Sequence, residues 1–259
     1  MKSAATDSGI SLLNFDGTLQ TQVLLGKYPA EWIDFTDLSG CRGYCTGESL
    51  SRIRSRLRSR KHRRITLIGP GNYHYVTYVL LSELRRPFAL VLFDHHTDLA
   101  PGGEIPYLSC GSWVSHALET LPLMKRVVII GANVPDRGWT DGLPGKVTVI
   151  PEQEARRMPA ESIARAVRSS ASDLPLYISV DKDVLDPDNA VTDWDQGSMT
   201  LRQLLDVIRE LKRILPLEGA DVCGEMPMTP VDLLSGERLR HLKKNERANQ
   251  AIVDALLAG

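Results

Sequence analysis

Short apolar segments alternate with longer amphipathic segments along most of the chain. The apolar segments are rich in β-branched residues and too short for helices, and several end in Gly or Asp. They predict strands over residues 65–69, 88–94, 126–131, 146–150, 176–181 and 219–224. Between them, apolar residues recur at helical spacing and predict helices over residues 48–60, 75–86, 112–120, 159–171, 200–214 and 235–257.

This alternation predicts an α/β fold with a central parallel sheet and helices on both faces. Residues 88–93 are continuously apolar, and residues 177–180 are mostly apolar rather than alternating, which is typical of central strands that are covered on both sides. The sequence contains no internal repeat and no low-complexity linker, so we expect residues 1–259 to form a single domain. Ligands of such sheets bind at the carboxyl ends of the strands.

The composition argues against several broad classes of function. The 259 residues are 42% hydrophobic and 24% charged, and a net charge of −1 disfavours a general nucleic-acid binder. Apolar runs that approach the ~20 residues of a membrane span are absent, and the first residues lack the pattern of a secretory signal. The four cysteines are scattered and form no disulfide framework. We therefore expect free thiols in the cytoplasm and no membrane partner.

Acidic residues and histidines follow the predicted strands at regular spacing. Asp94, His96 and Asp98 come directly after one buried strand. Alternate residues of an extended segment project from the same face, so these three side chains are expected to converge. Asp181 and Asp183 follow a second buried strand at the same spacing.

A sixth candidate, His74, lies shortly after a third predicted strand. The carboxyl ends of parallel strands share one edge of the sheet, so all six side chains are expected to meet. Four clustered carboxylates repel one another unless cations neutralise them. Carboxylates and imidazoles without thiolates suit Mn²⁺ or another divalent first-row ion. Six ligands are enough for two ions, which would lower the pKa of a bound water and supply hydroxide near neutral pH.

Three segments that contain these residues resemble the motifs of the ureohydrolases, the family of arginase, agmatinase and formiminoglutamase. That family carries Gly-Gly-Asp-His, then Asp-Ala-His-x-Asp, then Ser-x-Asp-x-Asp-x-x-Asp-Pro. The matching segments, in the same order, are Gly71-Asn72-Tyr73-His74, Asp94-His95-His96-Thr97-Asp98 and Ser179-Val180-Asp181-Lys182-Asp183-Val184-Leu185-Asp186-Pro187. The resemblance covers roughly residues 65 to 230 and implies the three-layer α/β fold of arginase.

The resemblance also implies a ligand set and a reaction. One Mn²⁺ would be held by His74, Asp94, Asp98 and Asp181, and the other by Asp94, His96, Asp181 and Asp183. Hydroxide between the two ions would attack the guanidinium carbon, and the products would be urea and an amine. Ureohydrolases commonly form trimers or hexamers, so a homo-oligomer is also expected.

Two positions near the implied metals depart from the family pattern. Ureohydrolases carry a proposed proton-shuttle His in a Ser-His-Gly or similar segment, and Cys110 stands in its place here. A thiol with a pKa around 8.5 moves protons less readily near pH 7 than an imidazole, so Cys110 either transfers protons or only packs. His95 and His116 are other candidates for the proton-shuttle role, but neither matches the family motif. Glu225 is the candidate to bond the guanidinium, although it lies one residue further from Asp221 than the family spacing.

The substrate side departs from the family as well. The loop at residues 99–109, which in arginases helps to hold the free amino acid, is short and lacks the expected Asn and Ser pattern. Residues 191–197 replace the family's Pro-Gly-Thr-Gly segment. Within them, Asp193 and Asp195 are candidates to attract a cationic side chain and Trp194 to stack on it; the alternative is a surface loop with a buried Trp. The chain thus resembles the peptide arginases, which convert arginine residues of ribosomal peptides to ornithine.

Other functions stay open from the sequence alone. The substrate is an arginine-containing peptide or a small guanidino compound such as free arginine or agmatine. A metal-dependent amidase is a second alternative, although the related deacetylases use one zinc and fewer carboxylates. A third is a catalytically silent metal- or peptide-binding module. The missing shuttle His supports this last alternative, and the complete ligand set opposes it.

A basic run occupies residues 52–64. Leu50, Ile53 and Leu57 would share one side of a helix and leave the charges on the rest. A solvated helix face is the commoner explanation of such a run. The alternative is docking of an acidic partner, such as the leader of a precursor peptide. Nucleic acid is disfavoured because no aromatic residues interleave with the charges.

Overall fold

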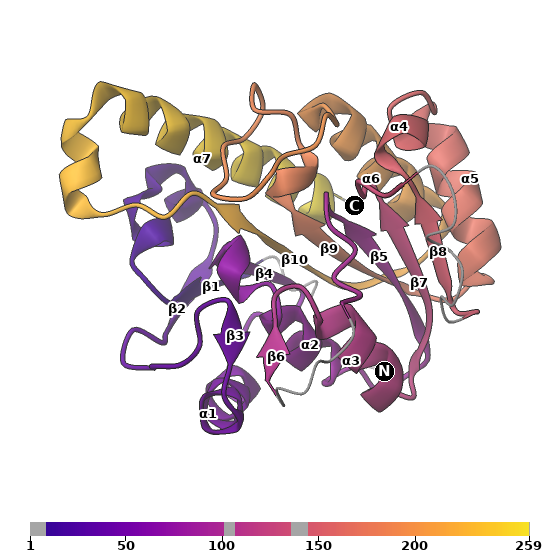
Figure 1. Cartoon of the computed structure of the whole chain (residues 1–259), viewed down its shortest axis with the longest axis horizontal. Coiled ribbons are helices and arrows are strands. Elements are labelled where there is room, and N and C mark those ends of the chain that lie inside the picture. Colours follow the sequence, from indigo (N-terminus) through magenta and orange to yellow (C-terminus); the bar gives the residue numbers. More distant parts are fainter. Residues whose placement is uncertain (1–8, 101–106, 136–144, 259) are drawn as a thin grey trace.

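An eight-stranded parallel sheet forms the centre of the protein (Figure 1). The computed structural model describes residues 9–100, 107–135 and 145–258. The strands are β1 (Ile10–Asn14), β2 (Ala30–Asp34), β4 (Ile65–Pro70), β5 (Phe88–Phe93), β7 (Met124–Ile130), β8 (Val147–Ile150), β9 (Leu176–Asp181) and β10 (Leu217–Glu225). Their spatial order is β2-β1-β4-β10-β9-β5-β7-β8. A separate antiparallel pair is formed by β3 (Tyr44–Cys45) and β6 (Leu108–Ser109).

All the predicted strands are present, but the sequence did not reveal β1 and β2. β2 is an edge strand whose residues alternate between exposed and half-buried, so no apolar run marks it. β1 is completely buried, yet its sequence is interrupted by a serine. Ser11 is tolerated there because its hydroxyl donates a hydrogen bond to His62 O at 2.6 Å.

Helices cover both faces of the sheet (Figure 1). One face carries α1 (Gly47–Arg58), α2 (Val76–Leu81) and α3 (Trp113–Thr120), and the other carries α5 (Ala160–Ala171), α6 (Leu201–Ile214) and α7 (Gly236–Leu257). Successive strand residues enter opposite cores: Leu90 packs with the first group of helices, and Val91 packs with the second. A single-turn helix, α4 (Glu152–Ala155), follows β8. The predicted three-layer α/β arrangement is confirmed.

The order of the strands reverses near the middle of the sheet. The chain passes from β4 to β5 across a gap of two strands, builds outward through β7 and β8, and returns to fill the gap with β9 and β10. β4, β10, β9 and β5 therefore lie next to one another. Open α/β sheets bind ligands at such a reversal, outside the carboxyl ends of the strands.

Several arginines of the basic run form ion pairs with acidic residues of the same chain. Arg52 and Arg56 form ion pairs with Asp37 at 2.8 and 2.6 Å. Arg60 is buried and forms an ion pair with Glu83 at 2.6 Å. These contacts favour the interpretation of the run as a structural, largely solvated helix face, and docking of an acidic partner stays a prediction.

The four cysteines are free thiols, as predicted, and only Cys110 is partly exposed. Within the described ranges, no helix has both the length and the apolar character needed to cross a bilayer.

Candidate metal centre

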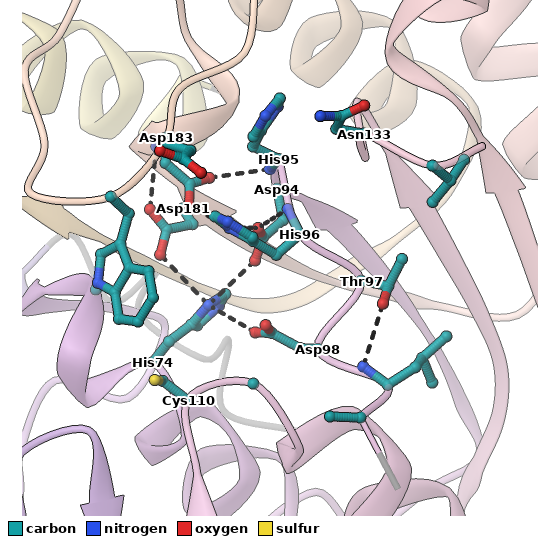
Figure 2. A pocket seen from close by; sticks show the side chains of 17 residues that line it. His74, Asp94, His95, His96, Thr97, Asp98, Cys110, Asn133, Asp181 and Asp183 are labelled. Atoms are coloured by element: carbon teal, nitrogen blue, oxygen red, sulfur yellow. Dashed lines mark hydrogen bonds and ion pairs between the residues drawn. The ribbon is translucent and has the colours of Figure 1, made fainter.

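A cavity of about 560 Å³ lies at the carboxyl ends of β4, β5 and β9. Its walls include all the predicted metal ligands: His74, Asp94, His96, Asp98, Asp181 and Asp183. Figure 2 shows these side chains pointing toward one another from three separate segments. His96 is partly exposed, and the other five are buried. The structure thus brings together six residues from three segments that are distant from one another in the sequence.

Three carboxylates surround one nitrogen of His74. Its Nδ1 lies 3.3 Å from Asp94 Oδ2, 3.2 Å from Asp98 Oδ2 and 3.4 Å from Asp181 Oδ2. A glycine is needed beside this group, because a Cβ at Gly71 would lie only 3.0 Å from Asp181 Oδ2. These four side chains form the first donor set, with one nitrogen and three carboxylates.

Asp94 is shared with a second donor set around His96. The Nδ1 atom of His96 lies 2.9 Å from Asp183 Oδ2 and 3.5 Å from Asp94 Oδ1. Asp94 therefore turns one oxygen toward each histidine, which suits a carboxylate that bridges two ions. The carboxylate of Asp181 is held between the two sets, because the Asp183 backbone N–H donates to its Oδ1 at 3.0 Å.

Bends in the backbone, rather than extended segments, bring these ligands together. β5 ends at Phe93, bends follow, and Asp98 adopts a left-handed conformation with φ of 53°. That region is unusual for residues other than glycine, although Asp tolerates it better than most. β9 likewise ends at Asp181, and a 3₁₀ turn follows at Lys182–Val184. The side chains do meet, as predicted, but the expected cause was wrong. They do not converge as alternate residues of an extended strand.

A hydrogen-bonded chain behind His74 was not predicted. His74 Nε2 lies 3.0 Å from Ser179 Oγ, and this hydroxyl donates to Asp221 Oδ1 at 2.7 Å. Since the Ser179 proton points to Asp221, the Ser179 oxygen can accept a hydrogen bond from Nε2–H, which leaves Nδ1 without a proton and free to bind a metal. The signal was present in the sequence: Ser179 precedes Asp181 by two residues of one strand and shares its face.

The buried carboxylates need more positive charge than the histidines supply. Burial raises the pKa of Asp98 to about 6, and the charge of Asp94 adds to this effect. Burial and neighbouring carboxylates also raise the pKa values of Asp181 and Asp183. Hydrogen bonds to Asp183 and Asp94 raise the pKa of His96 to about 11. Two imidazoles cannot balance four carboxylates, whereas two divalent cations can. The donor set therefore fits a binuclear centre.

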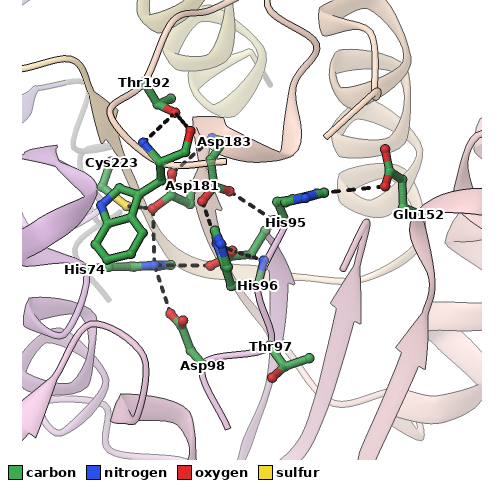
Figure 3. Close-up of polar contacts among 12 residues, drawn as sticks. His74, His95, His96, Thr97, Asp98, Glu152, Asp181, Asp183, Thr192 and Cys223 are labelled. Carbon is green, nitrogen blue, oxygen red and sulfur yellow. Dashed lines mark hydrogen bonds and ion pairs between the residues drawn. The ribbon is translucent and has the colours of Figure 1, made fainter. Parts of the chain in front are cut away.

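Cys110 lies at the edge of the cavity, near Asp98 and His74 (Figure 2). Burial, and then the charge of Asp98, raises the pKa of its thiol to about 11. Such a thiol stays protonated near pH 7, which makes it a poor proton shuttle. His95 also lines the cavity, but its ring points toward Glu152, with 3.9 Å between Nδ1 and Oε2 (Figure 3). His116 is not among the residues that line the cavity.

Glu225, the predicted guanidinium partner, points away from the cavity. Its carboxylate forms an ion pair with Lys182, which is completely buried. It also accepts hydrogen bonds from Asn245 at 3.1 Å and from Asn249 at 2.5 Å, both on α7. In this arrangement Glu225 belongs to a buried polar network with Lys182, Asn245 and Asn249, and it does not line the cavity.

An irregularity in β10 explains this placement. The pairing of β10 with β4 shifts register on both sides of Cys223, and Gly224 has a φ of 84°. Gly224 occupies the position at the family spacing from Asp221, and a Cβ there would collide with Asp181. A side chain cannot be placed at that position without displacing a ligand. Such a bulge re-aims the following residue, so Glu225 is turned toward α7.

Of the three predicted substrate-binding residues in the 191–197 segment, two line the cavity and one does not. Asp193 accepts a hydrogen bond from Asn72 Nδ2 at 3.0 Å and is not among the residues that line the cavity. Trp194 and Asp195 do line it. Trp194 is 42% exposed, and its ring lies 5.8 Å from the ring of His96. Of the predicted 99–109 loop, residues 101–106 lie outside the described part of the chain.

Comparisons with known proteins agree with this geometry. The arginase family model matches residues 11–230. An uncharacterized protein of Thermotoga maritima is 32% identical, over 95% of this chain and 89% of that protein. An agmatinase of Chromobacterium violaceum is 30% identical over 61% of this chain, and the match spans about half of that protein, 49%. The arginase of Bacillus cereus shares the fold, with a TM-score of 0.70 at 15% identity over 95% of this chain and 98% of its own. This chain belongs to the arginase family.

Proposed function

We propose that this protein hydrolyses the guanidino group of its substrate to urea and an amine. The observation that carries the proposal is the pair of donor sets that share Asp94. When two divalent ions, Mn²⁺ in the first instance, are bound there, they supply a water of lowered pKa as the nucleophile. The agmatinase and arginase relatives support this reaction class.

The residues of the chain have separable roles in this proposal. His74, Asp94, Asp98 and Asp181 would hold one ion, and Asp94, His96, Asp181 and Asp183 the other. Ser179 and Asp221 keep Nδ1 of His74 turned toward Asp94, Asp98 and Asp181, where it could serve as a ligand of the first ion. At the mouth of the cavity, Trp194 offers an aromatic face and Asp195 a carboxylate, which together suit the approach of a guanidinium.

The proposed substrate is the arginine side chain of a ribosomal peptide, which would become ornithine. Among the described residues that line the cavity, none is a lysine or an arginine that could pair with the α-carboxylate of free arginine. A peptide has no such carboxylate at the modified residue. Agmatine, which also lacks it, is the second candidate, and the similarity to an agmatinase favours it.

Release of urea tests the proposal. The metal-stripped protein is loaded with Mn²⁺ and incubated separately with free arginine, agmatine and an arginine-containing peptide, and urea is measured. We expect urea from the peptide, together with the mass change from arginine to ornithine. Urea from agmatine alone would support the proposed reaction but identify agmatine, rather than a peptide, as the substrate. No urea from any of the three would overturn the proposal in favour of a deacetylase-like amidase or a non-catalytic binding module.

The proposal includes a cytoplasmic location and a homo-oligomer. Sedimentation of the purified protein tests the second, and fractionation of the native cells tests the first. The four free thiols are consistent with a reducing compartment.

A further inference from the structure

The thiol of Cys223 lies against two members of the first donor set, His74 and Asp181, and is not part of the lining of the cavity. Figure 3 shows Cys223 beside Asp181, and Sγ lies 3.1 Å from Asp181 Oδ2. The same oxygen lies 3.4 Å from His74 Nδ1. One donor atom each from His74, Asp181 and Cys223 lie within 4.8 Å of one another, and all three residues are buried.

The topology of the sheet places this thiol between two of the metal-binding segments. β10 lies between β4, which leads to His74, and β9, which ends at Asp181. Cys223 pairs with Asp181 on one side and with Gly69 on the other. Asp221, two residues earlier on the same strand, already supports His74 through a hydroxyl. Cys223 lies two residues closer than Asp221 to the carboxyl end of β10, the edge of the sheet at which the donor sets lie.

The carboxylate of Asp181 is oriented by the same strand. Its Oδ1 accepts from the Asp183 backbone and packs against Gly224, whereas its Oδ2 faces Cys223 and His74. The sulfur therefore approaches the oxygen that is offered to the first ion. Because Cys223 is 1% exposed and does not line the cavity, its thiol is not placed to react with a substrate.

We propose that Cys223 is a sulfur ligand of the first metal position, in addition to its nitrogen and carboxylates. The inference rests on the binuclear centre of the proposed function. As the metal–sulfur bond forms, the thiol proton leaves to solvent. A thiolate favours Zn²⁺, Co²⁺ or Fe²⁺ over the harder Mn²⁺, whereas the second position, with His96 and carboxylates, has no such ligand. The two positions therefore prefer unlike ions.

Cobalt spectroscopy of the full-length protein tests this inference without measuring turnover. The metal-stripped protein is titrated with Co²⁺ under anaerobic conditions, and two sets of absorption bands are followed. Visible d–d bands report that Co²⁺ is bound, and a near-ultraviolet charge-transfer band reports a thiolate bound to it. We expect both in the native chain, and we expect Cys223→Ser to lose only the charge-transfer band. Cys110→Ser, which alters a thiol at the edge of the same cavity, is the matched control and keeps both.

Competition between metals gives a second readout. Dialysis against equal concentrations of Zn²⁺ and Mn²⁺ is expected to load the native protein with both ions. In Cys223→Ser the preference for Zn²⁺ should fall by about tenfold or more, because even outer partners of a metal ligand are worth about 10–100-fold in affinity. If Cys223→Ser fails to fold, cobalt-edge X-ray absorption of the native and Cys110→Ser proteins shows directly whether sulfur is bound.

The unfavourable outcomes are distinct. Visible bands without a charge-transfer band in the native protein would show that Cys223 only donates a hydrogen bond to Asp181, and would overturn the inference alone. Loss of the charge-transfer band in Cys110→Ser would overturn it by assigning the sulfur to Cys110. Absence of all bands would mean that no metal binds, and the proposed function would fail with it.

Discussion

The floor and the rim of the cavity are built on different principles. We define the floor as the six side chains of the two donor sets and the rim as Cys110, Trp194 and Asp195. Floor residues follow central strands and are fixed by several contacts each; His74, for example, meets three carboxylates and a hydroxyl. Rim residues lie outside the eight-stranded sheet, and Trp194 is 42% exposed. The sheet thus sets the chemistry, and the loops set which molecule reaches it.

The largest effect is expected on the floor itself. Asp183→Ala removes the carboxylate that contacts His96, and with it a proposed ligand of the second ion. Because a bound ion supplies several kcal/mol of stabilisation to the reaction, urea release should fall by about 10³-fold or more. Circular dichroism should still show a folded protein. Activity near the native level would remove Asp183 from the centre and contradict the importance of the floor.

In the buried polar network of Glu225, we expect a substitution to lower stability rather than substrate binding. Glu225→Ala leaves Lys182 buried without its carboxylate, and the free energy of unfolding should fall by about 3–5 kcal/mol. Denaturant unfolding measures this, with Glu237→Ala on α7 as a control outside this network. A native unfolding curve combined with a raised KM would instead assign Glu225 to the substrate.

The chain of hydrogen bonds behind His74 should affect metal affinity. Asp221→Asn places an amide donor next to Ser179, so the hydroxyl can turn its proton toward His74 and disturb the orientation that exposes Nδ1. We expect metal affinity to weaken by about 10–100-fold in a chelator competition assay. An unchanged affinity would show that the two donor sets alone orient the ring.

On the rim, the expected effects are smaller. Asp195→Asn removes a carboxylate from the cavity wall, and kcat/KM for the guanidino substrate should fall by about two- to fivefold, the scale of a partly exposed ion pair. Asp193→Asn is the matched control, because Asp193 is engaged by Asn72 and does not line the cavity. Equal losses in both variants would mean that the segment acts through its overall charge.

The smallest effect is expected at Cys110. Burial raises the pKa of its thiol to about 11, so the group is neutral on both sides of pH 7, and Cys110→Ser should change the rate by about twofold at most. The pH–rate profile should likewise be unchanged between pH 6 and 9. A loss of about 10²-fold, with a shifted profile, would restore the thiol as a proton shuttle and make the rim as important as the floor.

The same contrast explains what could be predicted from the sequence. The strands that carry the floor are short, mostly apolar runs that end in Gly or Asp, so their ends, and the residues that follow them, could be located closely. The sequence did not place Glu225 because the bulge at Gly224 shifts the side-chain direction by one residue. The extra residue after Asp221 and the glycine within the strand were its signs in the sequence. The position of Asp193 in the structure depends on a hydrogen bond from Asn72, which is 121 residues away in the sequence. No local sequence pattern could have predicted that contact.

The conformation of Gly224 also limits how this chain can change. A single base substitution could place another amino acid at this position, but any side chain there would meet Asp181, and the positive φ would strain it further. Restoring an acidic side chain at the family spacing would therefore require deletion of a residue from β10 together with re-pairing of the strand. A simple substitution at Gly224 therefore cannot supply that side chain, and we expect changes of substrate range to arise in the loops around the cavity instead.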